Sequence, residues 1–246
     1  MMKKVILPVI VCLVVLGISI GVLQWRSQDA DTRMIAEVEA NNEEAAMAFE
    51  NAVAPATEKT IEKIDINPRV EGGSFVVGAD DAPITILEFS SLSCPHCATF
   101  HANSLSDLKK DYVESGKVKF VFNDFPLNKP AVDGSLLLKC VDIKDRYDFM
   151  EILFSQQSQW AFNGDHREKL TQYAALLGVS SDKAEACMND TDSERAMFEK
   201  MRVNNQKYQV KSTPTFVVLP SEKVITGAQN YGVFSTEIER LLSEAE

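Results

Sequence analysis

The sequence predicts an α/β domain whose sheet is interrupted by a block of helices. Residues 84–90, 98–115 and 118–123 read as a strand, a helix and a second strand of βαβ length, a succession that places two parallel strands side by side. From residue 130 to about 187 the spacing of apolar residues is that of helices. We therefore expect an α/β core split by an all-helical insertion at about residues 128–190.

The folded domain is expected to span residues 72–246. The remaining predicted elements of the domain are a short strand, a long helix, two strands in a hairpin-like arrangement and a terminal amphipathic helix, at residues 74–77, 191–208, 215–219, 223–226 and from about 234.

Composition and charge exclude one class of function. The 246 residues are 45% hydrophobic and 25% charged, as in an ordinary globular protein. The net charge is −11, the opposite of the basic footprint of a nucleic-acid-binding protein. We therefore expect no nucleic-acid partner.

Residues 1–26 are predicted to be a signal peptide or an N-terminal membrane anchor. Lys3 and Lys4 precede an apolar run at residues 5–23, which is the pattern of an exported chain. Two interpretations are open: cleavage after Gly21 as a signal peptide, or retention as an anchor, because 19 helical residues nearly span a bilayer. Both place the rest of the chain outside the cytoplasm, either released after cleavage or anchored by residues 5–23.

Residues 27–71 are expected to form a helical stalk and linker. Within residues 28–54, apolar and small side chains follow the spacing of a short coiled-coil seam, with Asn42 at one seam position. The segment is either a solvated tether or an oligomerisation segment that makes the protein a homo-oligomer.

The motif Cys94-Pro95-His96-Cys97 lies where a strand gives way to a helix. Pro95 suits the first helical turn, and the unpaired N–H groups of that turn stabilise a thiolate at Cys94. His96 can add a hydrogen bond or a positive charge beside the same sulfur. These effects lower the pKa of Cys94 and make it an attacking thiolate, while Cys97 is placed to resolve a mixed disulfide.

Two other interpretations of the motif carry less weight. A zinc site would draw on His96 and His101, but the sequence has no second CxxC motif. A purely structural disulfide across two residues would close too short a loop to stabilise the fold. We therefore expect a redox-active Cys94–Cys97 disulfide, no metal and no other cofactor.

The sequence around this motif, LEFSSLSCPHCATFH, resembles the DsbA-like thiol–disulfide oxidoreductases of the bacterial periplasm. The segment STPTF at residues 212–216 is similar to the cis-proline loop of that family. The resemblance covers about residues 72–246 and implies a thioredoxin-like fold with a helical insertion. It also implies a place in the bacterial periplasm, either soluble after cleavage or anchored to the inner membrane by residues 5–23. It implies that Cys94 is the nucleophile, that Cys97 resolves, and that Pro214 is cis, with Thr213 presenting its backbone to an extended substrate.

Three further side chains complete the expected site and its support. Glu88 is the acid in an otherwise apolar strand, six residues before Cys94, and a buried carboxylate there could exchange a proton with Cys97. The family has a buried acid at this position. Cys140 and Cys187 are expected to form a structural disulfide, because exposed thiols oxidise outside the cytoplasm and some family members carry a second disulfide.

The remaining histidines and aromatic residues are given structural interpretations. His101 and His166 are expected at the surface. The large aromatic side chains expected in the core rather than in a substrate platform are Phe100, Phe120, Phe122, Phe216 and Trp160.

Three functions of different kinds are compatible with these features. The first is an oxidase that passes its disulfide to unfolded exported proteins and is reoxidised by a membrane partner of the DsbB type. The second is an oligomeric isomerase that acts on misfolded proteins and is kept reduced by a partner of the DsbD type; threonine before the proline and the stalk are reminiscent of isomerases. The third is an anchored envelope protein that only binds, for which the CPHC motif offers no reason.

Overall fold

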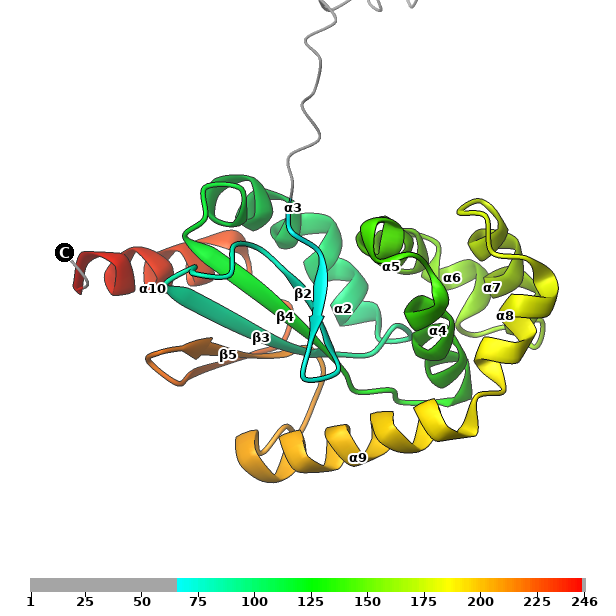
Figure 1. Cartoon of the computed structure of the whole chain (residues 1–246). Helices are drawn as coiled ribbons and strands as arrows, with labels where there is room; N and C mark the ends of the chain where they lie inside the picture. The colour runs from blue at the N-terminus through cyan, green and yellow to red at the C-terminus, as the bar shows by residue number, and fades with distance from the viewer. Residues whose placement is uncertain (1–65, 245–246) are drawn as a thin grey trace, which may run out of the picture. The chain divides into compact units, whose positions relative to one another are not determined.

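The computed structural model describes residues 66–244, which form a six-stranded sheet with helices on both faces (Figure 1). In spatial order the strands are β1 (Arg69–Glu71), β2 (Ser74–Val77), β4 (Val118–Asp124), β3 (Ile84–Ser90), β5 (Thr215–Leu219) and β6 (Lys223–Thr226). β3 and β4 are parallel, as the βαβ spacing predicts, and the other neighbouring pairs are antiparallel. The predicted export segment and the predicted coiled-coil seam lie outside the described residues.

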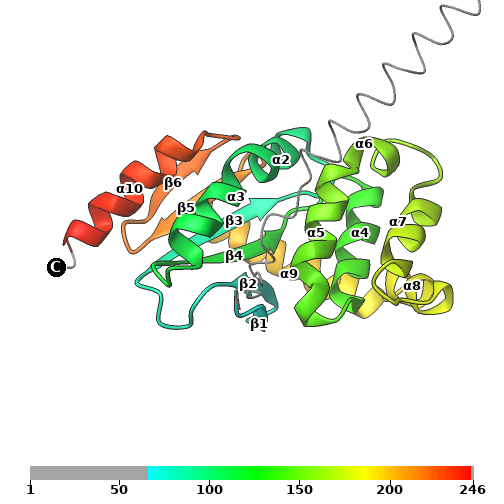
Figure 2. The ribbon, with the colours of Figure 1, turned by 90° about the horizontal axis from the view of Figure 1, so that it is seen from above.

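One helical run covers one face of the sheet together with the terminal helix. The run consists of α2 (Pro95–Phe100), the π-helical turn η1 (His101–Leu105), α3 (Ser106–Leu108) and a second π-helical turn η2 (Lys109–Val113). It lies beside α10 (Tyr231–Glu244), whereas α9 (Thr191–Tyr208) covers the opposite face (Figures 1 and 2). The CPHC motif therefore lies at the start of the helical run that covers this face of the sheet.

The predicted helical insertion is present. Its helices are α4 (Lys129–Cys140), η3 (Ile143–Asp145), α5 (Arg146–Ser155), α6 (Gln157–Trp160), α7 (His166–Ala175) and α8 (Ser181–Met188). They lie together at one end of the sheet, in green and yellow in Figure 2. α5 also contacts α2 and η1, so the insertion forms one wall of the region around the CPHC motif.

Aromatic side chains fill the space between the sheet and the covering helices. The rings of Phe100 and Phe216 are 4.4 Å apart, and that of Phe234 lies 5.3 Å from the first and 4.9 Å from the second. Close aromatic packing of this kind stabilises the contact beyond the area it buries. All five large aromatic residues expected in the core are buried: Phe100, Phe120, Phe122, Phe216 and Trp160.

The structure differs from the predicted elements mainly at the edges. β1 precedes the expected domain start at residue 72; it has only three residues and is held by pairing with β2 across the Gly72–Gly73 turn, so no local pattern marks it. The helix of the CPHC motif begins at Pro95 rather than at residue 98, and α10 begins at Tyr231 rather than at 234.

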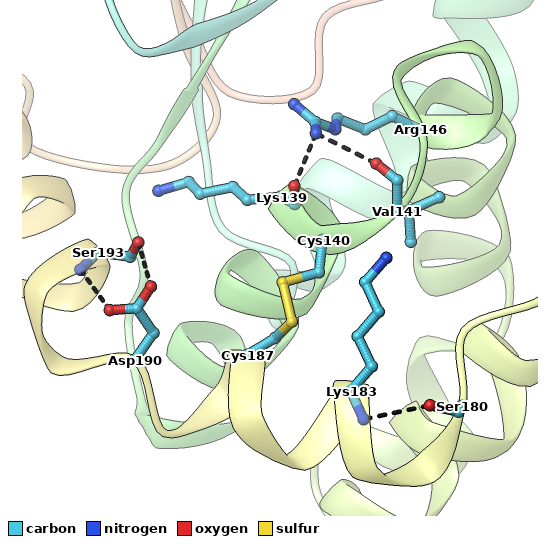
Figure 3. Close-up of a disulfide and its surroundings, with 9 residues drawn as sticks. All are labelled: Lys139, Cys140, Val141, Arg146, Ser180, Lys183, Cys187, Asp190 and Ser193. Atoms are coloured by element: carbon cyan, nitrogen blue, oxygen red, sulfur yellow. Dashed lines mark hydrogen bonds between the residues drawn. A yellow bond between two sulfur atoms is a disulfide. The ribbon is translucent and has the colours of Figure 1, made fainter.

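A disulfide joins Cys140 at the end of α4 to Cys187 in α8, the pairing expected from the sequence (Figure 3). Beside it, the Arg146 guanidinium donates to the carbonyl oxygens of Lys139 at 2.7 Å and Val141 at 3.2 Å. These bonds satisfy acceptors that the end of α4 leaves without helical partners. The disulfide and the arginine together fix the last turn of α4.

Between residues 66 and 244, no helix has the length and apolar character needed to cross a membrane.

Replacing both Cys140 and Cys187 with alanine is expected to lower the free energy of unfolding by about 2–4 kcal/mol, because the bridge closes a loop between residues 47 apart in sequence. Urea unfolding of the two proteins measures the difference. Reducing the wild-type protein with dithiothreitol should lower its stability to that of the variant. Equal stability of the oxidised wild type and the variant would contradict a structural role for the bridge.

Candidate functional site

Cys94 occupies the N-cap position of α2, immediately after a tight loop that leaves the central strand β3. Its backbone is extended, with φ −85° and ψ 118°, and its N–H donates to the carbonyl oxygen of Ser91 at 2.9 Å. Pro95 is in the first turn, where a missing N–H costs no helical hydrogen bond. The sequence thus folds so that the Cys94 sulfur lies at the positive end of a helix.

The two thiols of the motif are free and differ in their surroundings. The exposed fraction of Cys94 is 4% and that of Cys97 is 0%. The pKa of Cys94 is lowered to about 5, chiefly by the hydrogen bond from the Cys97 thiol. A side-chain hydrogen bond with Thr213 and the backbone N–H groups of Cys97 and His96 lower the pKa further, whereas burial opposes the shift. Cys94 is therefore a thiolate at neutral pH.

The environment of Cys97 acts in the opposite direction. Burial raises the pKa of its thiol, and the hydrogen bond to Cys94 and the negative charge of Glu88 raise it further. Cys97 therefore stays protonated while its neighbour is ionised. Two thiols whose pKa values are pushed apart in this way are suited to different steps of one reaction.

The segment expected to face the cysteines does so. The Thr213–Pro214 peptide bond is cis, and the carbonyl oxygen of Thr213 lies 3.3 Å from Cys94 Sγ, at hydrogen-bond distance for a protonated thiol. The Thr213 and Pro214 side chains are buried directly before β5, which begins at Thr215. A segment 119 residues away in sequence thus closes the site opposite Cys94.

Glu88 is buried, with no exposed surface. It lies in β3 level with Phe122 of β4 and Phe216 of β5, so its neighbours along the sheet are apolar. Glu88 Oε1 accepts from His101 Nε2 at 3.1 Å, and His101 Nδ1 lies 2.7 Å from Glu151 Oε1. The sequence signal for Glu88, a lone acid in an apolar strand, indicated this burial.

The expectation that His101 lies at the surface is wrong. His101 is 3% exposed and lies between the two carboxylates. Burial alone would lower its pKa, but the carboxylates of Glu88 and Glu151 outweigh burial and raise the pKa to about 9. His166 is half-buried beside Asp133, with 2.9 Å between Nε2 and Oδ2, so it is not a free surface residue either.

His96 contributes differently from the expectation. Its side chain is exposed, and its backbone N–H, not its imidazole, is the group that lowers the pKa of Cys94. Within residues 66–244, the structure contains no group of three or more His, Cys, Asp or Glu side chains arranged to hold a metal ion.

Gln157 supports the site, although no sequence pattern marks it. From α6 in the insertion, its Nε2 donates to the carbonyl oxygens of Leu92 at 2.8 Å and Cys94 at 3.0 Å. Its side chain is buried, with 5% exposed. Gln157 stands in a run of polar residues, where no local pattern distinguishes it from its exposed neighbours.

A protein-family model described as thioredoxin matches residues 71–240. A relative from Rickettsia felis, whose name assigns it to the protein-disulfide oxidoreductases, is 28% identical over 185 residues, which are 75% of this chain and 66% of that protein. The chain thus spans just under two thirds of that relative's length. Disulfide bond formation protein D from Bacillus subtilis is 29% identical over 201 residues, 76% of this chain and 84% of that protein.

Two solved structures share the fold. Alpha-DsbA1 from Wolbachia pipientis has a TM-score of 0.67 at 24% identity, covering 72% of this chain and 94% of that chain. Oxidised BdbD from Bacillus subtilis has a TM-score of 0.62 at 28% identity, covering 68% of this chain and 92% of that chain.

Alkylation of the reduced protein by iodoacetamide is expected to follow the ionisation of Cys94, with a midpoint at about pH 5. The Cys97→Ala variant loses the strongest hydrogen bond to the thiolate, so its midpoint should rise. The Cys97→Ser variant keeps a donor and should stay closer to the wild type. A midpoint that is the same in all three proteins would contradict the assigned cause of the shift.

The Gln157→Ala variant is expected to lower the free energy of unfolding by about 1–3 kcal/mol, because the carbonyl of Leu92 loses its side-chain donor and that of Cys94 keeps only the N–H of Ala98. Gln159→Ala, at an exposed position two residues away, is the matched control and should change stability little. Urea unfolding measures both. A Gln157→Ala variant as stable as the control would show that the insertion does not hold the CPHC loop.

Proposed function

We propose that this chain, which belongs to the thioredoxin family, is a protein-disulfide oxidoreductase that oxidises pairs of cysteine thiols in exported proteins. The observation that carries this function is the separation of the two thiol pKa values, lowered at Cys94 and raised at Cys97. A binding protein needs no ionised thiol next to a buried protonated one. Dithiol–disulfide exchange needs both.

The oxidising cycle begins with the Cys94–Cys97 disulfide. A substrate thiolate attacks Cys94 Sγ, a mixed disulfide forms, and Cys97 leaves with the bonding electron pair and takes up a proton. A second substrate thiolate then attacks the substrate sulfur of the mixed disulfide, which forms the substrate disulfide and releases Cys94 as a thiolate. Two electrons pass from the substrate to the protein, whose dithiol form is the one described here.

Three other residues support these steps. Glu88 is the buried carboxylate that exchanges a proton with Cys97, since its charge already acts on that thiol. Thr213 and the cis Pro214 lie opposite Cys94, where an extended substrate segment can pair with the backbone of Thr213. Substrate binding and chemistry then share one surface next to Cys94.

The direction of electron flow follows from the state that the site stabilises. The thiolate of Cys94 exists only in the reduced form, so every interaction that lowers its pKa makes the disulfide a stronger oxidant. A partner must then accept the two electrons, and a membrane protein of the DsbB type would fit a protein of the bacterial envelope. Unfolded proteins that carry free cysteines are the corresponding substrates.

The second candidate is an oligomeric disulfide isomerase. It rests on Thr213 before the cis proline and on the predicted seam at residues 28–54, which would bring several sites to one misfolded substrate. A partner of the DsbD type would keep such a protein reduced.

Two assays with the full chain in detergent micelles distinguish these functions. Oxidation of reduced ribonuclease and recovery of scrambled ribonuclease are followed side by side, with Cys94→Ser as the inactive control. Rapid oxidation without unscrambling is expected for the oxidase. Efficient unscrambling that is lost when residues 28–54 are deleted would identify the isomerase, and rates equal to those of the Cys94→Ser protein would rule out both.

A further inference from the structure

A histidine lies buried between two carboxylates behind the CPHC motif, and the oxidation cycle above gives it no part. Glu88 comes from β3, His101 from η1 and Glu151 from α5. The side chains of Glu88 and His101 are 0% and 1% exposed, whereas that of Glu151 is 35% exposed. The three groups form a hydrogen-bonded chain from the buried Glu88, whose charge acts on Cys97, to the partly exposed Glu151.

Packing holds the imidazole in one orientation. Its ring centroid is 3.9 Å from that of Phe154, 5.8 Å from that of Phe100 and 6.1 Å from that of Phe122. His101 lies one helical turn after Cys97, so the motif and the histidine belong to the same helical run. The aromatic neighbours exclude water from the ring and leave the two carboxylates as its polar contacts.

The other titratable groups near these three hydrogen-bonded side chains do not compete for the proton of His101. Tyr147 of α5 is buried, and burial together with the charges of Glu151 and Glu88 raises the pKa of its phenol. Lys109 of η2 lies over the Tyr147 ring, 5.7 Å from its centroid, and pairs with Glu114. Cys97 is the remaining group that faces the Glu88 charge.

The hydrogen bonds determine which proton of His101 can move. Both ring nitrogens donate when the imidazole is protonated, Nδ1 to Glu151 and Nε2 to Glu88. The contact to Glu151 is shorter, 2.7 Å against 3.1 Å, and fixes a proton on Nδ1. The Nε2 proton is therefore the mobile one. On Glu88, Oε2 is buried without a hydrogen-bond partner among the described residues, so no bond on that side prevents the carboxyl group from turning after Oε1 takes the proton.

The chemistry at Cys97 requires such a proton. A thiol with a raised pKa is a poor leaving group as a thiolate, yet Cys97 must leave when a substrate attacks Cys94. Cys97 and Glu88 are both closed to solvent. The proton must therefore come from within the protein.

We propose, on the basis of the function assigned above, that His101 is a positioning residue that stores the proton for Cys97. When Cys97 leaves as a thiolate, the Nε2 proton of His101 passes to Glu88, and Glu88 protonates the Cys97 sulfur. His101 is then protonated again, because its pKa of about 9 applies to the dithiol form. When Cys97 is later oxidised, the proton of its thiol passes to the partner thiolate that leaves, and Glu151 keeps the ring in the tautomer whose Nε2 takes up the next proton.

The test measures the rate at which the oxidised full chain forms a mixed disulfide with an aromatic thiol that stays ionised between about pH 6 and pH 10. In the wild-type protein the rate should be constant at neutral pH and fall above about pH 9, where His101 loses its proton. The His101→Gln variant cannot supply the proton, so its rate at neutral pH should be lower by about tenfold or more and the fall should be absent.

Two further variants separate proton storage from packing. Glu151→Gln removes one of the carboxylates that raise the pKa of His101, so the fall should move to lower pH. His166→Gln, the matched change at a histidine paired with Asp133 in the insertion, should leave the profile unchanged. A fall that stays near pH 9 in the Glu151→Gln protein, or that persists in His101→Gln, overturns the proposal.

The same assay distinguishes failure of this proposal from failure of the proposed function. A wild-type protein that reacts rapidly with the thiol but has no pH-dependent fall is a disulfide oxidoreductase without a proton store at His101. A wild-type protein that reacts no faster than the Cys94→Ser variant has neither.

Discussion

The burial of one carboxylate, Glu88, in the central strand constrains the rest of the site. A charged group between Phe122 and Phe216 loses its hydration, at an effective cost of several kcal/mol for an ion, unless a partner compensates it. The compensating group is His101, and its position depends on how the helical run lies across the sheet. The ion pair that stabilises Glu88 thus also holds the helix that carries Cys94 and Cys97, and α5 completes the pair by supplying Glu151.

The two cysteines acquire opposite properties although they are one helical turn apart. Cys94 lies at the helix terminus, where N–H groups and the Cys97 thiol point toward its sulfur. Cys97 lies one turn deeper, over the sheet and near a carboxylate. The position of each thiol along the helix therefore sets its pKa: Cys94 is the better leaving group, and Cys97 keeps its proton. Gln157 ties the loop before the helix to the insertion, which keeps this depth difference fixed.

The sequence predicts those features whose causes are local. The strand and helix flanking CPHC, the thiolate at a helix N-terminus and the burial of Glu88 follow from neighbouring residues. The burial of His101 does not, because it arises from α5, 50 residues further along, folding over an otherwise unremarkable helical position. The cis state of Pro214 had to be taken from a family resemblance, since an X-Pro bond is trans by default.

The arrangement around Cys94 favours rapid exchange as well as oxidising strength. A stabilised thiolate is a good leaving group from a mixed disulfide. The hydrogen bonds that lower the pKa of Cys94 therefore also favour release of the substrate disulfide. The inner thiol has the reverse problem, because burial makes it slow to leave and slow to ionise. A carboxylate and a protonated imidazole beside it can supply its proton without opening the site to water. The buried Glu88–His101 pair therefore complements Cys97 in the way that the helix terminus complements Cys94, and both steps of the exchange have their own stabilising group.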